Sequence, residues 1–117
     1  MQEKRQYERC DIDMPAQCRL SSNPDCSYDT SVINISGEGL GIVSSALFKK
    51  YDTIEIKLKL EDVGDVVIKA QVMWKKEIAV ECYSCGVMII DADHKDHDKF
   101  IHFYVEKMLL VSKKEGA

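Results

Sequence analysis

Short segments in which apolar residues alternate with polar ones limit this chain to a fold built mainly of strands. In residues 54–60 (IEIKLKL), every second residue is apolar. A period of two is typical of a strand with one face in a core. The same reasoning predicts five more strands, at residues 12–20, 26–35, 40–44, 66–74 and 85–90. The segments lie close together in the chain, and this spacing favours antiparallel strands joined by turns.

The alternation also predicts which residues face the core. Ile33 and Ile35 should share one face of the second strand, and Trp74 should continue the face of Val72 in the fifth. The run VMII at residues 87–90 predicts a sixth strand buried on both faces. Residues 21–25 (SSNPD) predict a turn between the first two strands.

The period changes after Asp91. Apolar residues then recur at steps of three and four, as on one face of a helix: Phe100, Ile101, Tyr104, Met108 and Val111. Aspartates lie near the start of this segment and lysines near its end, an order that suits the helix dipole. We therefore predict a mainly β protein, a six-stranded antiparallel barrel with a C-terminal α-helix. The 117 residues form one domain, with an N-terminal arm at 1–12, the barrel at 13–91 and the helix at 93–112.

The charge and hydropathy of the chain limit the classes of partner that it can bind. A net charge of −4 disfavours non-specific binding of nucleic acid, which needs a broad basic surface. The apolar runs are too short to cross a bilayer, and the first nine residues lack the apolar core of a signal peptide. We expect a cytoplasmic protein that neither binds nucleic acid nor inserts into a membrane.

The sequence contains no set of residues that predicts catalysis. Its five cysteines are an odd number, and we expect free thiols. Cys82 and Cys85 form a CxxC, which leaves open a metal or redox module, although zinc would need two further ligands. His94 and His97 lie among aspartates, and we interpret this cluster as an acidic helix start. We expect no enzyme, no metal and no cofactor.

Two short segments contain side chains that are suited to binding a ligand. The first, RQYER, presents Arg5 and Arg9 four residues apart. Each guanidinium can hold a phosphate through two parallel hydrogen bonds, grip the Hoogsteen edge of guanine, or stack on a purine. A pair with this spacing is also what a solvated charged arm contains.

The second segment is NISGEG, at residues 34–39. Asn34 and Ser36 fall on one face by alternation, and an amide beside a hydroxyl can bind a base edge and a phosphate oxygen. Glycines such as Gly39 let the backbone turn and approach a ligand closely. The alternative is an ordinary turn in which Asn34 and Ser36 bond to their own backbone.

Together the two segments resemble the PilZ domain family, which is marked by RxxxR followed by [D/N]xSxxG. Arg5 and Arg9 match the first motif, and Asn34, Ser36 and Gly39 match the second. The resemblance covers nearly the whole chain, including a tryptophan near the end of a long strand, a glycine in the last strand and a C-terminal helix. These are Trp74, Gly86 and residues 93–112.

This resemblance implies a receptor for the bacterial second messenger cyclic di-GMP. The two arginines would clasp guanine edges and phosphates, and Asn34, Ser36 and Gly39 would shape the pocket. Lys4 would add a cation beside Arg5, and Gly86 would lie at the same site. Binding would change how the domain interacts with an unknown downstream protein in motility, biofilm or polysaccharide control. The alternative is an adaptor of the same fold that binds a protein and no nucleotide.

Overall fold

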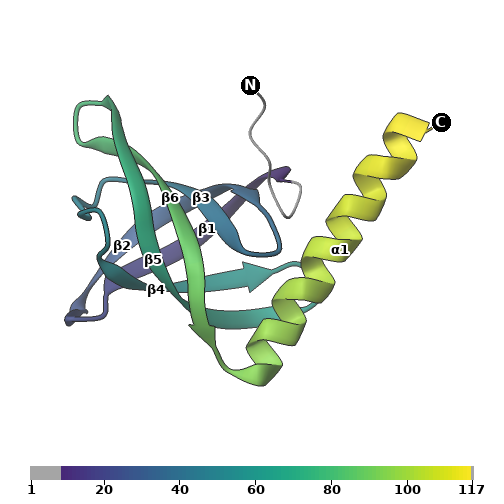
Figure 1. Ribbon diagram of the computed structural model, residues 1–117, viewed down its shortest axis with the longest axis horizontal. Helices are drawn as coiled ribbons and strands as arrows, with labels where there is room; N and C mark the ends of the chain where they lie inside the picture. The colour runs from purple at the N-terminus through teal and green to yellow at the C-terminus, as the bar shows by residue number, and fades with distance from the viewer. Residues whose placement is uncertain (1–8, 117) are drawn as a thin grey trace.

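The computed structural model describes the backbone of residues 9–116 and the side chains of residues 9–110. It contains six strands and one helix (Figure 1). The strands are β1 (Cys10–Leu20), β2 (Asn23–Ile35), β3 (Gly39–Ser44), β4 (Thr53–Leu60), β5 (Gly64–Ala79) and β6 (Cys82–Ala92). The helix is α1 (His94–Gly116). All six strands were predicted, but β2 begins at Asn23, inside the segment predicted to be a turn.

The strands form a closed antiparallel barrel in the order β1-β2-β3-β6-β5-β4. The sheet closes because β1 pairs with β4 through residues such as Cys18 and Ile56. Its interior holds the residues that alternate along each strand, and most of these side chains are fully buried. They include Cys18, Val32, Ile42, Ile54, Ile56, Leu58, Ile68, Ala70, Val72 and Cys85. Burial of this apolar surface is the main term that stabilises the fold.

Strand β6 corrects one prediction. Its apolar run is not buried on both faces, because Met88 and Ile90 are 39% and 45% exposed. Val87 is buried, and the register of the β5–β6 pairing shifts between Lys69 and Ala70. The strand therefore has one core face and one outer face, as expected for a strand of an antiparallel barrel.

Two irregularities correct the predicted faces of β2 and β5. The β2–β3 register shifts between Val32 and Asn34, so Ile33 is an extra residue that is exposed while Ile35 is fully buried. The β5–β6 register shifts between Val72 and Trp74, so Trp74 lies outside. A β-bulge adds one residue to one strand, and the residues after it therefore lie on the opposite face from the one that strict alternation predicts.

Helix α1 packs against β5 and β1, and its C-terminal part extends away from the barrel (Figure 1). Its start is capped by Asp93, whose Oδ1 accepts a hydrogen bond from the Lys95 N–H at 2.9 Å. Oδ2 of Asp96 accepts one from the Val67 N–H on β5 at 3.1 Å. Three aromatic residues of the helix join the barrel core: Phe100, Phe103 and Tyr104.

Candidate ligand-binding site

One row of cross-strand partners crosses four strands on the outside of the barrel. From β2 through β3 and β6 to β5, the partners are Asn34, Gly41, Gly86 and Trp74. We call this row the outer strip. Its neighbours along each strand point into the core, as shown by buried Ile35, Ile42 and Cys85. Adjacent strands lie about 4.8 Å apart, so the strip spans about 14 Å.

The Asn34 amide lies over Gly41. A Cβ atom added to Gly41 would come within 2.6 Å of Nδ2 and 2.8 Å of Oδ1 of Asn34. No side chain fits at that position without moving the amide. Gly41 is buried although it faces outward, because the Asn34 side chain covers it. The carboxamide is thus held on the barrel surface, where it offers both a donor and an acceptor.

The Trp74 indole covers Gly86 in the same way. A Cβ atom on Gly86 would overlap Nε1 and Cε2 of the ring and lie 2.8 Å from Cδ1. Trp74 remains 42% exposed, so it presents apolar surface to solvent at one end of the strip. An exposed indole is a platform on which a purine base can stack. The strip therefore places an amide at one end, an aromatic ring at the other, and glycine backbone between them.

Ser36 forms the turn beside this strip. Its hydroxyl accepts hydrogen bonds from the N–H groups of Glu38 and Gly39 at 3.3 and 3.2 Å, and the side chain is buried. Gly39 admits no side chain, because a Cβ there would meet the Val87 carbonyl oxygen. Both residues therefore fix the backbone that comes after Asn34, and the Ser36 hydroxyl is engaged within its own turn.

Arg9 is the described member of the predicted arginine pair. It immediately precedes β1, whose first residues Cys10 and Asp11 pair with Ile35 and Asn34. This register places Arg9 beside the Ser36 turn, and its side chain is exposed. The structure thus brings Arg9, Asn34, Ser36 and Gly39 to one corner of the barrel, with Gly86 two strands beyond Asn34. Lys4 and Arg5 lie outside the described residues.

The thiols near this corner are neutral. Burial, with a smaller effect of the Asp11 carboxylate, raises the pKa of the Cys10 thiol, although Lys107 lowers it slightly. Burial also raises the pKa of Cys85, against a smaller opposing effect of Lys75. A protonated thiol is a poor nucleophile and a poor metal ligand. Within the part of the chain that the structure describes, no three histidine, cysteine or acidic side chains gather as a metal site.

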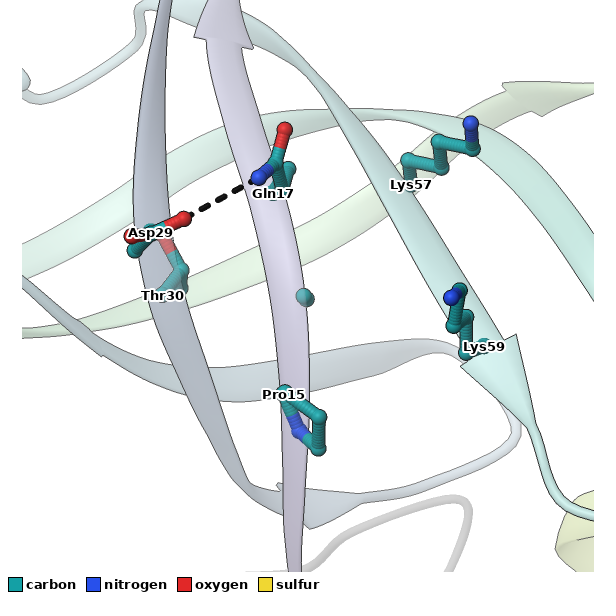
Figure 2. Close-up of a pocket in the computed structure, with 7 residues that line it drawn as sticks. Pro15, Gln17, Asp29, Thr30, Lys57 and Lys59 are labelled. Atoms are coloured by element: carbon teal, nitrogen blue, oxygen red, sulfur yellow. Dashed lines mark hydrogen bonds between the residues drawn. The ribbon is translucent and has the colours of Figure 1, made fainter.

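A separate hollow lies elsewhere on the barrel, between β2, β1 and β4, with a volume of about 450 Å³. Figure 2 shows Lys57 and Lys59 along one side and Gln17 donating to Asp29, at 3.0 Å, on the other. None of the predicted site residues that the structure describes lines it. The hollow shares strand β2 with the outer strip but lies at Asp29 and Thr30, whereas the strip begins at Asn34.

Sequence reasoning missed two members of the strip as site residues. Gly41 lies outside the predicted motif. It is recognised as part of the strip only from the strand register, which pairs it with Asn34 and Gly86. Trp74 stood out for its position in a long strand, but alternation assigned it to the core. The bulge after Val72 had no signal in the sequence that would have corrected this assignment.

Comparison with known proteins identifies the family. The model of the PilZ domain family matches residues 3–106, which is most of the chain. The chain belongs to the PilZ domain family. No curated protein sequence matches it.

Several solved structures share the fold of this PilZ domain. The PilZ domain of YcgR from Escherichia coli, solved with c-di-GMP, has a TM-score of 0.73 at 12% identity, and the match covers 97% of this chain and 98% of that one. The MrkH–c-di-GMP complex from K. pneumonia has a TM-score of 0.74 at 14% identity, covering 96% and 56%. MotI/DgrA, an inhibitor of motility from Bacillus subtilis, has a TM-score of 0.71 at 18% identity, covering 92% and 52%.

This PilZ domain spans about half the length of the MotI and MrkH chains. At these identities the likeness concerns the fold. In the described part of the domain, no helix is both long and apolar enough to cross a membrane.

Proposed function

We propose that this PilZ domain is a receptor for cyclic di-GMP and that the ligand binds between the N-terminal arginines and the outer strip. The observation that carries the proposal is the strip itself. Two side chains able to recognise a purine, the Asn34 amide and the Trp74 indole, are held on glycine backbone beside the corner where Arg9 enters the barrel. Family relatives solved with c-di-GMP support the choice of ligand.

Each group has a distinct part in this proposal. Arg9, together with Arg5, binds phosphate oxygens and the guanine Hoogsteen edge through charge-assisted hydrogen bonds. The Asn34 amide bonds to a base edge, and Trp74 stacks on a base. Ser36 and Gly39 act indirectly by fixing the turn between Asn34 and β3. Gly41 and Gly86 keep the floor clear of side chains.

Trp74 supplies the test, because it is the only tryptophan in the chain and lies on the strip. Titration with cyclic di-GMP should change its fluorescence emission in a saturable way, and calorimetry should give the same dissociation constant. GTP and cyclic AMP serve as controls and should cause no saturable change at the same concentrations. Absence of both a fluorescence change and a heat signal with cyclic di-GMP would overturn the proposal.

We further propose that ligand binding changes how the domain contacts a downstream protein. Residues 2–12 contain both arginines, so a ligand that engages them would alter the surface next to the strip. Amide exchange of residues 2–12 should slow when cyclic di-GMP is added, whereas the core amides of β4 serve as an internal reference. Equal exchange with and without ligand would refute this switch and leave the binding proposal standing.

A further inference from the structure

Two hollows adjoin on the outer face of β1. The first is the hollow of Figure 2, with a volume of about 450 Å³. The second has a volume of about 400 Å³. Its lining residues are Gln17, Arg19, Ser27, Glu55, Lys57 and Val67. The two hollows share Gln17 and Lys57, which are register partners on β1 and β4. Together they form one groove, which follows β1 from Pro15 to Arg19 and which we call the β1 groove.

The β1 groove has the length of a short extended peptide. A strand rises about 3.3 Å per residue, so the distance from residue 15 to residue 19 is about 13 Å. An extended segment of about five residues covers the same distance. Both edges of β1 are already paired, one with β2 and the other with β4. An occupant therefore lies on the outer face and is held through its side chains.

The wall that β4 contributes to the groove carries two cations without partners. Lys57 and Lys59 are exposed, and among the described residues neither ammonium group forms an ion pair. They are two residues apart in one strand, so both belong to its outer face, about 7 Å apart along it. This wall is therefore suited to two anionic groups with the same spacing.

The acidic side chains of the groove hold other residues. Glu55 is paired with Arg19, with 2.7 Å between Oε1 and Nη2. On the wall opposite the lysines, Asp29 accepts a hydrogen bond from Gln17 at 3.0 Å, as Figure 2 shows. Asp29 keeps its negative charge. The two walls therefore differ, because one attracts anions and the other attracts hydrogen-bond donors.

We infer that the β1 groove binds an extended acidic segment of a partner protein, with two carboxylates at positions i and i+2. Side chains two residues apart in an extended chain point to the same side and lie about 7 Å apart, which is the spacing of Lys57 and Lys59. Each carboxylate then accepts a charge-assisted hydrogen bond from one ammonium group. The residue between them points toward Asp29, where a serine or threonine hydroxyl donates a hydrogen bond.

The chemistry of the groove favours a peptide over a single-stranded nucleic acid. None of the described residues that line the groove has an aromatic ring on which a base could stack. The Asp29 carboxylate would repel a phosphate backbone, and the net charge of −4 adds to that repulsion. A peptide avoids this cost, because it can place its carboxylates on the lysine side alone.

A labelled peptide tests the inference on the full chain without cyclic di-GMP. The probe is a pentapeptide that alternates serine and glutamate and carries a neutral dye. Exposed ion pairs are individually weak, so fluorescence anisotropy should show saturable binding below about 1 mM. Lys57→Glu with Lys59→Glu should weaken binding by on the order of tenfold, because two attractions become repulsions. Lys49→Glu with Lys50→Glu makes the same change in net charge outside the groove, and should weaken binding by less than about threefold.

Four results would overturn the inference. The first is binding that does not saturate by about 1 mM. The second is equal affinity for a control peptide with glutamine in place of glutamate. The third is an equal loss in the two double variants, which circular dichroism must show to be folded, because net charge alone would then explain it. The fourth is tighter binding of a thymidine oligonucleotide of the same length. Each of these leaves the proposed binding of cyclic di-GMP unaffected, because that ligand is absent from the experiment.

Discussion

At the scale of single residues, Arg9 is the described cation of the proposed site and the first to test. Arg9→Ala should weaken cyclic di-GMP binding by on the order of 2 kcal/mol, about 30-fold, because charge-assisted hydrogen bonds are lost. Calorimetry measures the change. Arg19→Ala is the matched control, since Arg19 is an exposed arginine paired with Glu55 at 2.7 Å on β4. Equal affinities of the two variants would contradict the assigned role of Arg9.

The two strip glycines can be tested separately, since each lies under a different side chain. Gly86→Ala should displace the indole and shift the emission of Trp74 even without ligand, whereas Gly41→Ala should displace Asn34 and leave the emission unchanged. Both variants should bind cyclic di-GMP on the order of tenfold more weakly, because each moves a recognition group. Unaltered emission in Gly86→Ala would show that the ring does not rest on Gly86.

The buried thiol of Cys18 predicts a loss of stability at high pH. Burial raises its pKa from 9.0 to about 11, against a smaller lowering effect of the hydrogen bond with Thr30. The unfolded chain therefore releases this proton at a lower pH than the folded one. The stabilisation is fully present below pH 9 and is lost as the pH rises to about 11, amounting to about 2–3 kcal/mol.

Urea unfolding of the wild type and of Cys18→Ala between pH 8 and about pH 11 isolates this effect. Lysines and tyrosines titrate in both proteins, so the difference between the two reports on Cys18. We expect the variant to lose less stability over this range. Parallel pH profiles would contradict the prediction.

At the scale of elements, the sequence predicted the strands and the helix well because buried faces impose a regular period. It failed where a bulge interrupts that period. Ile33 was expected to share a face with Ile35, and Trp74 to share one with Val72. Neither does, because one extra residue, Ile33 in β2 and Met73 in β5, interrupts the alternation. A bulge depends on pairing between strands distant in sequence, so no local pattern reveals it.

The same two bulges create the outer strip. Had the register of Val32 and Ile42 continued, Ile33 would stand opposite Gly41. If the β5–β6 register set by Val72 and Val87 had continued, Met73 would lie opposite Gly86 and Trp74 would point inward. The motif residues could be predicted from the sequence, but the pairing of Asn34 and Trp74 with glycines required the structure.

Helix α1 contributes to stability mainly through its first turns. Phe100 is fully buried at one end of the barrel core, whereas Val105 on the same helix is 46% exposed. Phe100→Ala should destabilise the domain by about 3–5 kcal/mol, the usual effect of removing a buried aromatic side chain. Val105→Ala, the control, should change stability by about 0.5 kcal/mol or less. Urea unfolding followed by circular dichroism measures both, and similar values would place Phe100 outside the core.

At the scale of the whole molecule, the net charge of −4 opposes an anionic ligand, so binding must depend on local cations. Raising the salt concentration from about 0.1 M to about 1 M shortens the Debye length from about 10 Å to about 3 Å. Attraction between phosphates and arginines is then screened, and we expect the affinity for cyclic di-GMP to fall by on the order of tenfold.

The Arg9→Ala variant separates this local effect from repulsion by the whole domain. Salt also screens the repulsion between the negatively charged domain and the anionic ligand. Weakening that repulsion would strengthen binding. If Arg9 holds a phosphate, the wild type should lose affinity with salt more steeply than the variant, because the variant has one fewer cation at the ligand. Thermal unfolding at both salt concentrations verifies that the domain stays folded. Affinity that rises with salt in the wild type would mean that the net negative charge, and not the arginine corner, governs binding.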